Sequence, residues 1–237
     1  MTNCKACGTE VTLKYCPNCG QELHLKRIDG HYIVHEIEHV LHFDKGILYT
    51  IRELLIRPGI SIRRFISKDR SRLVKPVIFI IITSLIYTIL SHFFHTDSVV
   101  NYDLPERSSS AVIFKWTADH LGYSNMIMGG FIALWIKLLF RKYTYNFFEI
   151  LIMLCFVMGS GMLIFSVFVL AEGLIHTDLK SVAGYFGIAY CAWAIGQFFD
   201  GKKIISYVKS LFCYLMGMAT YSLLALGIGT LIDLIKS

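Results

Sequence analysis

The sequence predicts an all-α membrane protein, in which a five-helix transmembrane bundle follows a small Cys4 zinc ribbon and amphipathic juxtamembrane helices. The first reason is composition, because 55% of the 237 residues are hydrophobic and 17% are charged. Soluble domains are about 45–50% apolar and about 25% charged. The second reason is a set of five long apolar runs, and the third is a pair of C-x-x-C-G motifs. This pattern argues against a water-soluble globule and against a disordered chain.

Three regions follow in order: a zinc ribbon at 1–25, an amphipathic, basic segment at 30–75 and the transmembrane bundle at 77–235. The ribbon is predicted from two C-x-x-C-G motifs separated by eight residues, whose cysteines are Cys4, Cys7, Cys16 and Cys19. Tetrahedral Zn²⁺ takes four thiolates at about 2.3 Å, and two tight turns each supply a pair. Glycine after each second cysteine permits the positive φ that such turns need.

We expect this zinc to be structural, because four thiolates leave no open coordination position. Disulfides fit poorly with a cytoplasmic, reducing location, and a redox C-x-x-C would need a βαβ context. Iron also accepts tetrahedral thiolates, so zinc is a preference. With almost no core, the ribbon would depend on the metal for most of its folding energy. Its expected partner is a protein, and no nucleic acid partner is expected.

The segment at 30–75 shows apolar residues at helical spacing between positions 31 and 66. It predicts two short amphipathic helices on the cytoplasmic surface of the bilayer. We expect the second to end at Arg57-Pro58-Gly59, because proline removes a donor and glycine loosens the backbone. Six cations follow close to the first apolar run, at Arg63, Arg64, Lys68, Arg70, Arg72 and Lys75. They fit contact with anionic lipids, at about 1 kcal/mol each, and they equally fit a plain topology signal.

A match to H-E-x-x-H begins at His35 and ends at His39. On a helix these two histidines would share a face and could hold a second metal, with Glu36 as the general base of a zinc peptidase. However, the match lies in a histidine stripe that also contains His31 and His42. Because such a stripe produces i,i+4 histidine pairs by itself, we interpret the motif as fortuitous, and we expect the chain not to be an enzyme.

Five transmembrane spans are predicted, at 77–94, 121–140, 147–171, 182–199 and 210–232. Each approaches or exceeds the roughly 20 residues that cross a bilayer as a helix. With five spans, the Lys and Arg residues on alternate sides sum to 19 and 4. The positive-inside rule then predicts a multi-pass protein of the inner membrane, with its N-terminus cytoplasmic and its C-terminus outside. The loop at 95–120 contains Ala111–Trp116, which fits either a short interfacial anchor or an ordinary connection.

Small and ionisable residues inside the spans bear on the function class. Glycines recur in the last three spans, where they favour close helix packing. No acidic residue falls at the middle of a predicted span, which counts against a proton- or sodium-coupled carrier.

The N-terminal residues resemble an uncharacterised family of bacterial polytopic membrane proteins with an N-terminal zinc ribbon. The resemblance covers about residues 1–90 and rests on Cys19-Gly20-Gln21, Thr50-x-x-x-Leu54, Arg57-Pro58-Gly59, Lys68-x-Arg70 and Lys75-Pro76. It implies zinc ligands at the four cysteines named above and a polytopic architecture. Family members tend to have glycine before a Lys-Arg pair. Here Ser67 precedes Lys68, and Asp69 separates it from Arg70.

The function expected from these patterns is a non-enzymatic platform for interaction, scaffolding or regulation of a membrane complex. Its partners would be the lipid bilayer, anionic lipids and a protein bound through the ribbon. A small permease or transporter subunit is the alternative, and it requires a polar, water-accessible cavity between the last three spans. The H-E-x-x-H metallopeptidase is the third hypothesis.

Overall fold

The computed structural model describes residues 2–3, 9–12, 17–18, 46–67, 72–94, 108–175 and 177–236. The chain divides into two compact units, Met1–Asp44 and Lys45–Ser237. In the first unit, strand β1 (Thr2–Asn3) pairs antiparallel with strand β2 (Glu10–Val11). In that unit the Asn18 side-chain amide also donates a hydrogen bond to Thr9 Oγ1 at 3.3 Å.

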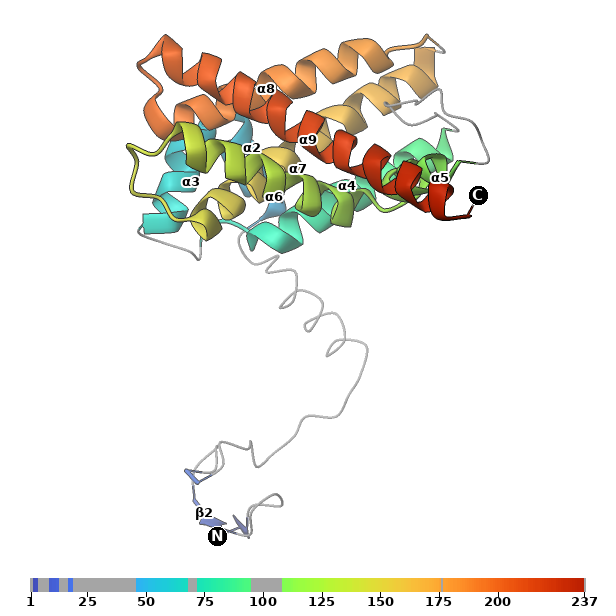
Figure 1. Cartoon of the computed structure of the whole chain (residues 1–237). Coiled ribbons are helices and arrows are strands. Elements are labelled where there is room, and N and C mark those ends of the chain that lie inside the picture. The colour runs from blue at the N-terminus through green and yellow to red at the C-terminus, as the bar shows by residue number, and fades with distance from the viewer. Residues whose placement is uncertain are drawn as a thin grey trace. The chain divides into compact units, whose positions relative to one another are not determined.

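The second unit contains five helices that are long and apolar enough to cross a bilayer, which confirms the predicted five-helix, all-α membrane bundle and makes the chain a multi-pass membrane protein. They lie alongside one another in Figure 1 and are α4 (Pro76–Phe93), α6 (Leu121–Leu139), α7 (Phe147–Ile175), α8 (Lys180–Asp200) and α9 (Ile204–Lys236). Helices α7 and α9 extend beyond their predicted ends, because hydropathy marks only the apolar part of a helix, whereas backbone hydrogen bonding continues into polar residues.

Helix α7 is the central helix of the bundle and packs against α4, α6 and α8. Its Phe156 is fully buried, as are Phe79 of α4 and Phe198 of α8. A Cβ added at Gly159 of α7 would lie 2.8 Å from the Phe79 ring. The glycine therefore lets α4 approach closely, which is the packing role expected for small residues in membrane helices.

Two short helices, α2 (Ile47–Ile56) and α3 (Pro58–Ser67), precede the first long helix. Pro58 does not stop the helical segment as expected; it begins α3, because proline is tolerated in the first helical turn, where its missing N–H has no partner to lose. Leu54 and Ile62 are 0% exposed, and the two helices pack against α7 and α8. Their buried apolar faces thus contact protein. Helix α2 corresponds to the second amphipathic helix, which the sequence pattern placed on the bilayer surface, whereas α3 was not predicted and the first amphipathic helix, before Asp44, lies outside the described residues.

A further helix, α5 (Ser109–Asp119), occupies the segment that the sequence pattern described only as an interfacial anchor or a loop. Ser108 caps its N-terminus, with Oγ accepting from the Ala111 N–H at 3.1 Å. The Ser109 N–H donates to both carboxylate oxygens of Asp233 on α9, at 3.0 and 3.1 Å. Helix α5 is therefore joined to the C-terminal part of α9 by a side chain that is 124 residues away in the sequence.

Candidate functional site

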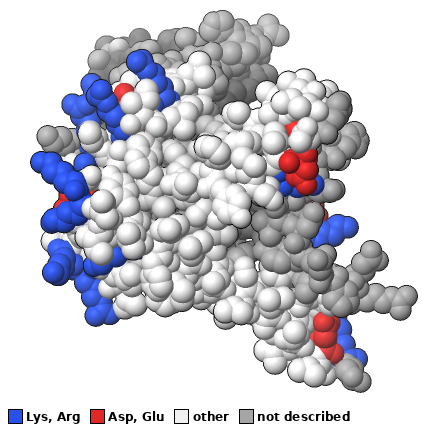
Figure 2. Space-filling model, turned by 90° about the horizontal axis from the view of Figure 1, so that it is seen from above, with Lys and Arg blue, Asp and Glu red and all other residues white. Residues whose placement is uncertain are grey.

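Positive charge is concentrated at one end of the helical bundle. Figure 2 shows the blue atoms gathered along one edge of the molecule, while red atoms are prominent toward the opposite side. Of the fifteen Lys and Arg residues that the structure describes in the second unit, twelve lie in α2, α3 and the segments next to them, in the α6–α7 and α8–α9 turns, or in the helical residues close to those turns. They are Arg52, Arg57, Arg63, Arg64, Arg72, Lys75, Lys137, Arg141, Lys142, Lys202, Lys203 and Lys209.

Helix α3 is fixed to the C-terminal end of α8 at this basic end. The Arg63 guanidinium donates from Nη1 to the carbonyl oxygens of Gln197 and Phe198, at 2.5 and 2.6 Å. These carbonyls belong to the last turn of α8, where the helix offers them no N–H partner and its dipole favours a cation. A Cβ at Gly59 would overlap the Gln197 carbonyl group. The backbones of the two helices are therefore in contact, and Arg63 provides hydrogen-bond donors for the free carbonyl groups at the end of α8.

Helix α2 is held by side-chain hydrogen bonds to three other parts of the bundle. The Val74 N–H, just before α4, donates to the buried Thr50 Oγ1 at 3.1 Å. The Tyr190 hydroxyl of α8 donates to the Leu54 carbonyl at 3.0 Å. The Ser61 hydroxyl of α3 donates to Glu53 Oε2 at 2.8 Å. These contacts make α2 and α3 a fixed part of the bundle.

A polar cavity of about 260 Å³ lies between α2, α3 and the residues just before α4. Three arginines line it, namely Arg57, Arg64 and Arg72, together with Tyr49 and Ser61. The Arg57 and Arg64 guanidinium groups have no hydrogen-bond or ion-pair partner among the residues that the structure describes. Among the described residues of the lining, Glu53 is the one carboxylate, and it accepts the Ser61 hydroxyl. The cavity, called the arginine pocket below, therefore has an excess of positive charge and of hydrogen-bond donors.

The arrangement suits an anion with several acceptor oxygens. Arginine presents a planar set of N–H donors that match a carboxylate or phosphate with two parallel hydrogen bonds. Arg57 and Arg64 present such groups to one cavity and can bind a phosphate from more than one side, while Arg72 of the same lining already has an interaction of its own. A hard metal cation would need more carboxylate ligands than the described lining offers. No described residues form a group of three or more His, Cys, Asp or Glu that could hold a metal.

The structure separates the six cations that the sequence grouped as lipid contacts. Arg64 and Arg72 line the arginine pocket, whereas Arg63 points to the α8 carbonyls and Lys75 precedes α4 outside the lining. Lys68 and Arg70 lie outside the described residues, as do the predicted metal ligands Cys4, Cys7, Cys16, Cys19, His35 and His39. The zinc ribbon and the second metal therefore remain predictions.

Arg57 is the pocket residue that sequence reasoning missed. It was part of the Arg57-Pro58-Gly59 segment that was expected to end a helix. The signal that could have identified it is spacing across the proline, because Arg57 and Arg64 are seven residues apart and two helical turns bring such positions to one side.

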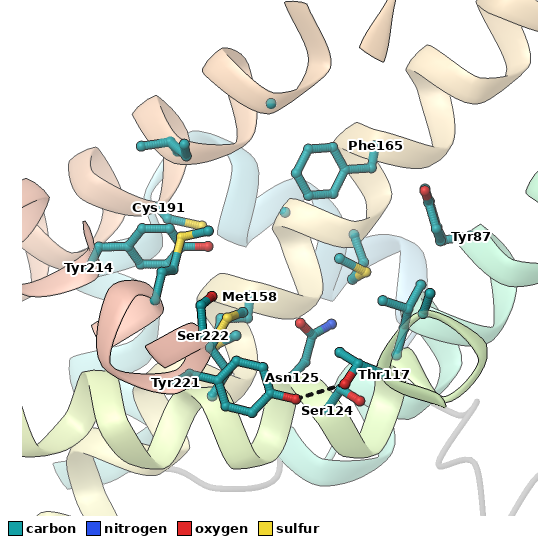
Figure 3. A pocket seen from close by; sticks show the side chains of 18 of the residues that line it. Tyr87, Thr117, Ser124, Asn125, Met158, Phe165, Cys191, Tyr214, Tyr221 and Ser222 are labelled. Carbon is teal, nitrogen blue, oxygen red and sulfur yellow. Dashed lines mark hydrogen bonds between the residues drawn. The ribbon is translucent and has the colours of Figure 1, made fainter. Parts of the chain in front are cut away.

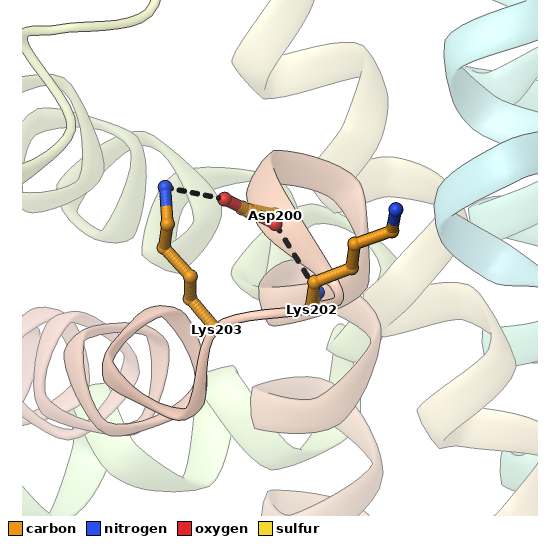
Figure 4. Close-up of polar contacts among 3 residues, drawn as sticks. All are labelled: Asp200, Lys202 and Lys203. Carbon is orange, nitrogen blue, oxygen red and sulfur yellow. Dashed lines mark hydrogen bonds and ion pairs between the residues drawn. The ribbon is translucent and has the colours of Figure 1, made fainter.

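Two neighbouring polar contacts complete this end of the bundle. In the turn between α8 and α9, Lys203 Nζ lies 3.0 Å from Asp200 Oδ2, and the Lys202 N–H donates to Asp200 Oδ1 at 3.1 Å (Figure 4). The hydrogen bond from Lys203 to this carboxylate raises the pKa of its ammonium above its usual value. Beside α3, burial raises the pKa of Tyr145, and the nearby Arg63 charge opposes that rise.

Comparison with known proteins gives one match. Residues 44–88 match the model of a family described as Protein of unknown function (DUF3667). No curated protein and no solved structure matches the chain. The matched segment contains α2, α3 and most of α4, so it includes all three arginines of the pocket. The part of the chain that is similar to this family is therefore the part that carries the arginine pocket and joins it to the bundle.

Proposed function

We propose that this chain is a non-enzymatic platform in the bacterial inner membrane, with its basic end and N-terminal zinc ribbon on the cytoplasmic side. In this proposal the arginine pocket binds the phosphate of an anionic lipid headgroup, and the ribbon binds a protein partner. The bundle anchors both, because the α2–α3 pair connects residues 1–44 to the long helices.

The observation that carries the proposal is the arginine pocket, together with the contacts that hold its helices against the bundle. Arg57, Arg64 and Arg72 line one cavity. The helices α2 and α3 that form it pack against α7 and α8, and they are hydrogen-bonded to α8 and to Val74 before α4. The pocket lies immediately before the first apolar helix, and the proposal therefore puts it at the depth of the lipid headgroups. A basic site next to a membrane helix on the cytoplasmic side is the expected arrangement for anionic lipid recognition.

The test measures phosphatidylglycerol retained by the purified full-length protein, by native mass spectrometry in detergent. The pocket variant carries Arg57→Gln, Arg64→Gln and Arg72→Gln. The matched control carries Arg141→Gln, Lys142→Gln and Lys202→Gln, which remove the same charge at the same end but outside the pocket. At about 1 kcal/mol per cation, the pocket variant should bind up to about 100-fold more weakly, and the control should retain most of the binding.

Two outcomes would overturn the headgroup assignment. Equal losses in both triple variants would mean that only the overall charge of this end attracts the lipid. Equal retention of phosphatidylcholine and phosphatidylglycerol by the unchanged protein would mean that the headgroup charge is not recognised. Inorganic phosphate at millimolar concentration distinguishes a site for small anions from a site for lipid headgroups. Phosphate should displace the lipid only if the lipid tail adds little to binding, which would indicate a small-anion site.

The ribbon part of the proposal is tested separately. Cys16→Ser should release the metal and weaken capture of the protein partner, while membrane insertion should be unchanged because the long helices lie outside the ribbon. A Cys16→Ser protein that keeps every partner would remove the ribbon from the proposed function and would leave the arginine pocket unaffected.

A further inference from the structure

A second cavity lies within the bundle, on the side away from the arginine pocket. Its volume is about 310 Å³, and residues from α4 through α9 line it. The lining includes Leu121, the first residue of α6, and Lys180, the first residue of α8. The cavity therefore extends from the interior of the bundle toward the end opposite α2 and α3. Figure 3 shows the surrounding side chains, with Phe165 and Met158 facing the space from α7.

The lining is mainly apolar and adaptable. Four methionines contribute to it, together with Phe114 and Phe165; the methionines are Met128, Met158, Met162 and Met218. Methionine fills irregular space and suits surfaces that adapt to a ligand. Of the lining residues that the structure describes, none is acidic and Lys180 is the one that is charged. An ionic ligand would lose hydration here without gaining an opposite charge deep in the cavity.

Two buried polar groups in the lining have no hydrogen-bond partner in the part of the chain that the structure describes. Asn125 Nδ2 and Ser124 Oγ are buried and make no hydrogen bond with any residue that the structure describes. Asn125 is 4% exposed and Ser124 is 3% exposed. In Figure 3 the Asn125 amide is directed into the space beside Met158 and Thr117. A buried donor without a partner opposes folding, so its position on a cavity wall indicates that a ligand atom completes it.

A neighbouring polar pair in the lining is already satisfied. Thr117 Oγ1 of α5 and the Tyr221 hydroxyl of α9 are 3.0 Å apart and satisfy each other. Asn125 lies on α6 beside this pair and is not included in it. Among the described residues that line the cavity, Asn125 and Ser124 are therefore the ones with a buried polar group that has no partner, and a hydrogen-bond partner for them must come from outside the described residues.

We propose that this cavity binds a neutral, membrane-dissolved lipophile that carries a carbonyl-type oxygen, with that oxygen accepting a hydrogen bond from Asn125 Nδ2. The apolar body of the ligand contacts the methionines and Phe165. The volume suits a small ligand or the head of a larger one, since binding cavities begin at about 300 Å³. The proposal is independent of the arginine pocket and of the zinc ribbon.

The probe for this site is benzophenone, a neutral aromatic ketone. Its carbonyl oxygen accepts one hydrogen bond, and light makes the same carbonyl abstract hydrogen from a nearby C–H group, after which the two carbon radicals join. Purified full-length protein in detergent is irradiated with increasing benzophenone, and the labelled peptides are mapped. Labelling should saturate and concentrate on Met158, Met162 and Met218.

A filling variant and a matched control separate this site from the lipid-facing surface. A Cβ added at Gly184, which lines the cavity, would meet nothing within 4 Å, and the same holds for Gly227 of α9 outside the lining. Gly184→Phe should therefore occupy the space and reduce labelling of the cavity methionines at least tenfold. Gly227→Phe adds the same side chain elsewhere and should leave labelling unchanged.

The hydrogen bond is tested by Asn125→Leu, which keeps the same branching and number of side-chain heavy atoms and removes the amide. We expect the benzophenone concentration for half-saturation to rise several-fold, while the unfolding temperature stays the same or rises because an unsatisfied donor has been removed. Labelling spread over outward-facing residues, or labelling that Gly184→Phe does not reduce, would overturn the site. Unchanged half-saturation in Asn125→Leu would overturn the role of the amide.

Discussion

Arg63 and Arg64 are adjacent in the sequence, yet their side chains have different environments. One residue advances a helix by about 100°, so neighbours face different sides. Arg63 is half-buried against the end of α8, and Arg64 is exposed on the arginine pocket. The sequence could show six cations before a span but could not show which cation contacts backbone carbonyls. We therefore expect substitution of Arg63 to affect mainly the stability of the bundle, and substitution of Arg64 to affect mainly lipid binding.

Arg63→Gln should lower the stability of the bundle by about 2 kcal/mol, because it removes charge-assisted hydrogen bonds to the Gln197 and Phe198 carbonyls. Arg64→Gln should change stability by less than about 0.5 kcal/mol, as exposed substitutions usually do, but should weaken phosphatidylglycerol binding. Thermal unfolding in detergent and native mass spectrometry measure the two effects. If both variants lost stability equally, the contact of Arg63 with α8 would not be stabilising.

Gly59→Ala is expected to destabilise the protein, although replacing a helical glycine by alanine usually stabilises it. In an open helical position this change stabilises by up to about 1 kcal/mol, and Gly130, where a Cβ meets nothing within 4 Å, is the control. At Gly59 the new Cβ would overlap the Gln197 backbone, so Gly59→Ala should destabilise by about 1–3 kcal/mol. Unfolding temperatures of the two variants give the comparison. A Gly59→Ala protein as stable as Gly130→Ala would argue against the close approach of α3 and α8.

At the scale of elements, α5 illustrates how tertiary contacts determine a helix with a modest sequence signal. Its eleven residues include β-branched and aromatic side chains, and isolated helices of that length are marginal in water. Helix α9 supplies the missing support, because Asp233 accepts the Ser109 N–H and Thr117 bonds to Tyr221. Residues 108–119 are therefore helical because of where they pack.

Asp233→Ala should loosen the first turn of α5. The Ser109 N–H would lose its acceptor, and a negative group would disappear from the helix N-terminus, where it is favourable. Hydrogen exchange of the amides at positions 109–113 should become several-fold faster. Asp119→Ala, at the exposed C-terminal end of the same helix, is the control and should leave these amides unchanged. Similar acceleration in both variants would mean that general charge, and not the Asp233 contact, protects α5.

The zinc ribbon is the second prediction at this scale. Metal analysis of purified protein should give one zinc per chain, and Cys16→Ser should lose it, because three thiolates hold the ion less tightly than four. Cys155→Ser is the control, since Cys155 is buried in α7. Iron in place of zinc would revise the metal but keep the site. A second metal that survives Cys16→Ser would point to His35 and His39 and would revive the enzyme hypothesis.

For the whole molecule, the distribution of charge predicts the orientation in the membrane. Twelve described cations lie at the α2–α3 end of the second unit, and the other three, Lys115, Lys180 and Lys236, belong to segments toward the opposite end. Positively charged ends stay cytoplasmic. A C-terminal fusion to alkaline phosphatase, which is active only after export, should therefore be active. A fusion after residue 201, in the turn between α8 and α9, should be inactive. The reverse pattern would contradict the cytoplasmic placement of the arginine pocket.

The sequence by itself determined the five spans, the concentration of charge at one end and the helical nature of the segment before the first span. These properties depend on the composition of contiguous residues, since a bilayer selects any apolar run of sufficient length. Helix ends were predicted less well, because a helix continues past the apolar residues that hydropathy detects. The roles of Arg57 and Pro58 were missed, since proline can begin a helix as well as end one.

Only the tertiary structure decided which residues meet. Arg63 contacts a carbonyl 134 residues away, Ser109 contacts a carboxylate 124 residues away, and the cavity around Asn125 has walls from six helices. Such sites depend on the rotation and spacing of packed helices, which are set by how side chains fit together across the bundle. Local sequence patterns do not determine that fit. The arginine pocket and the apolar cavity could therefore be identified only from the assembled helices.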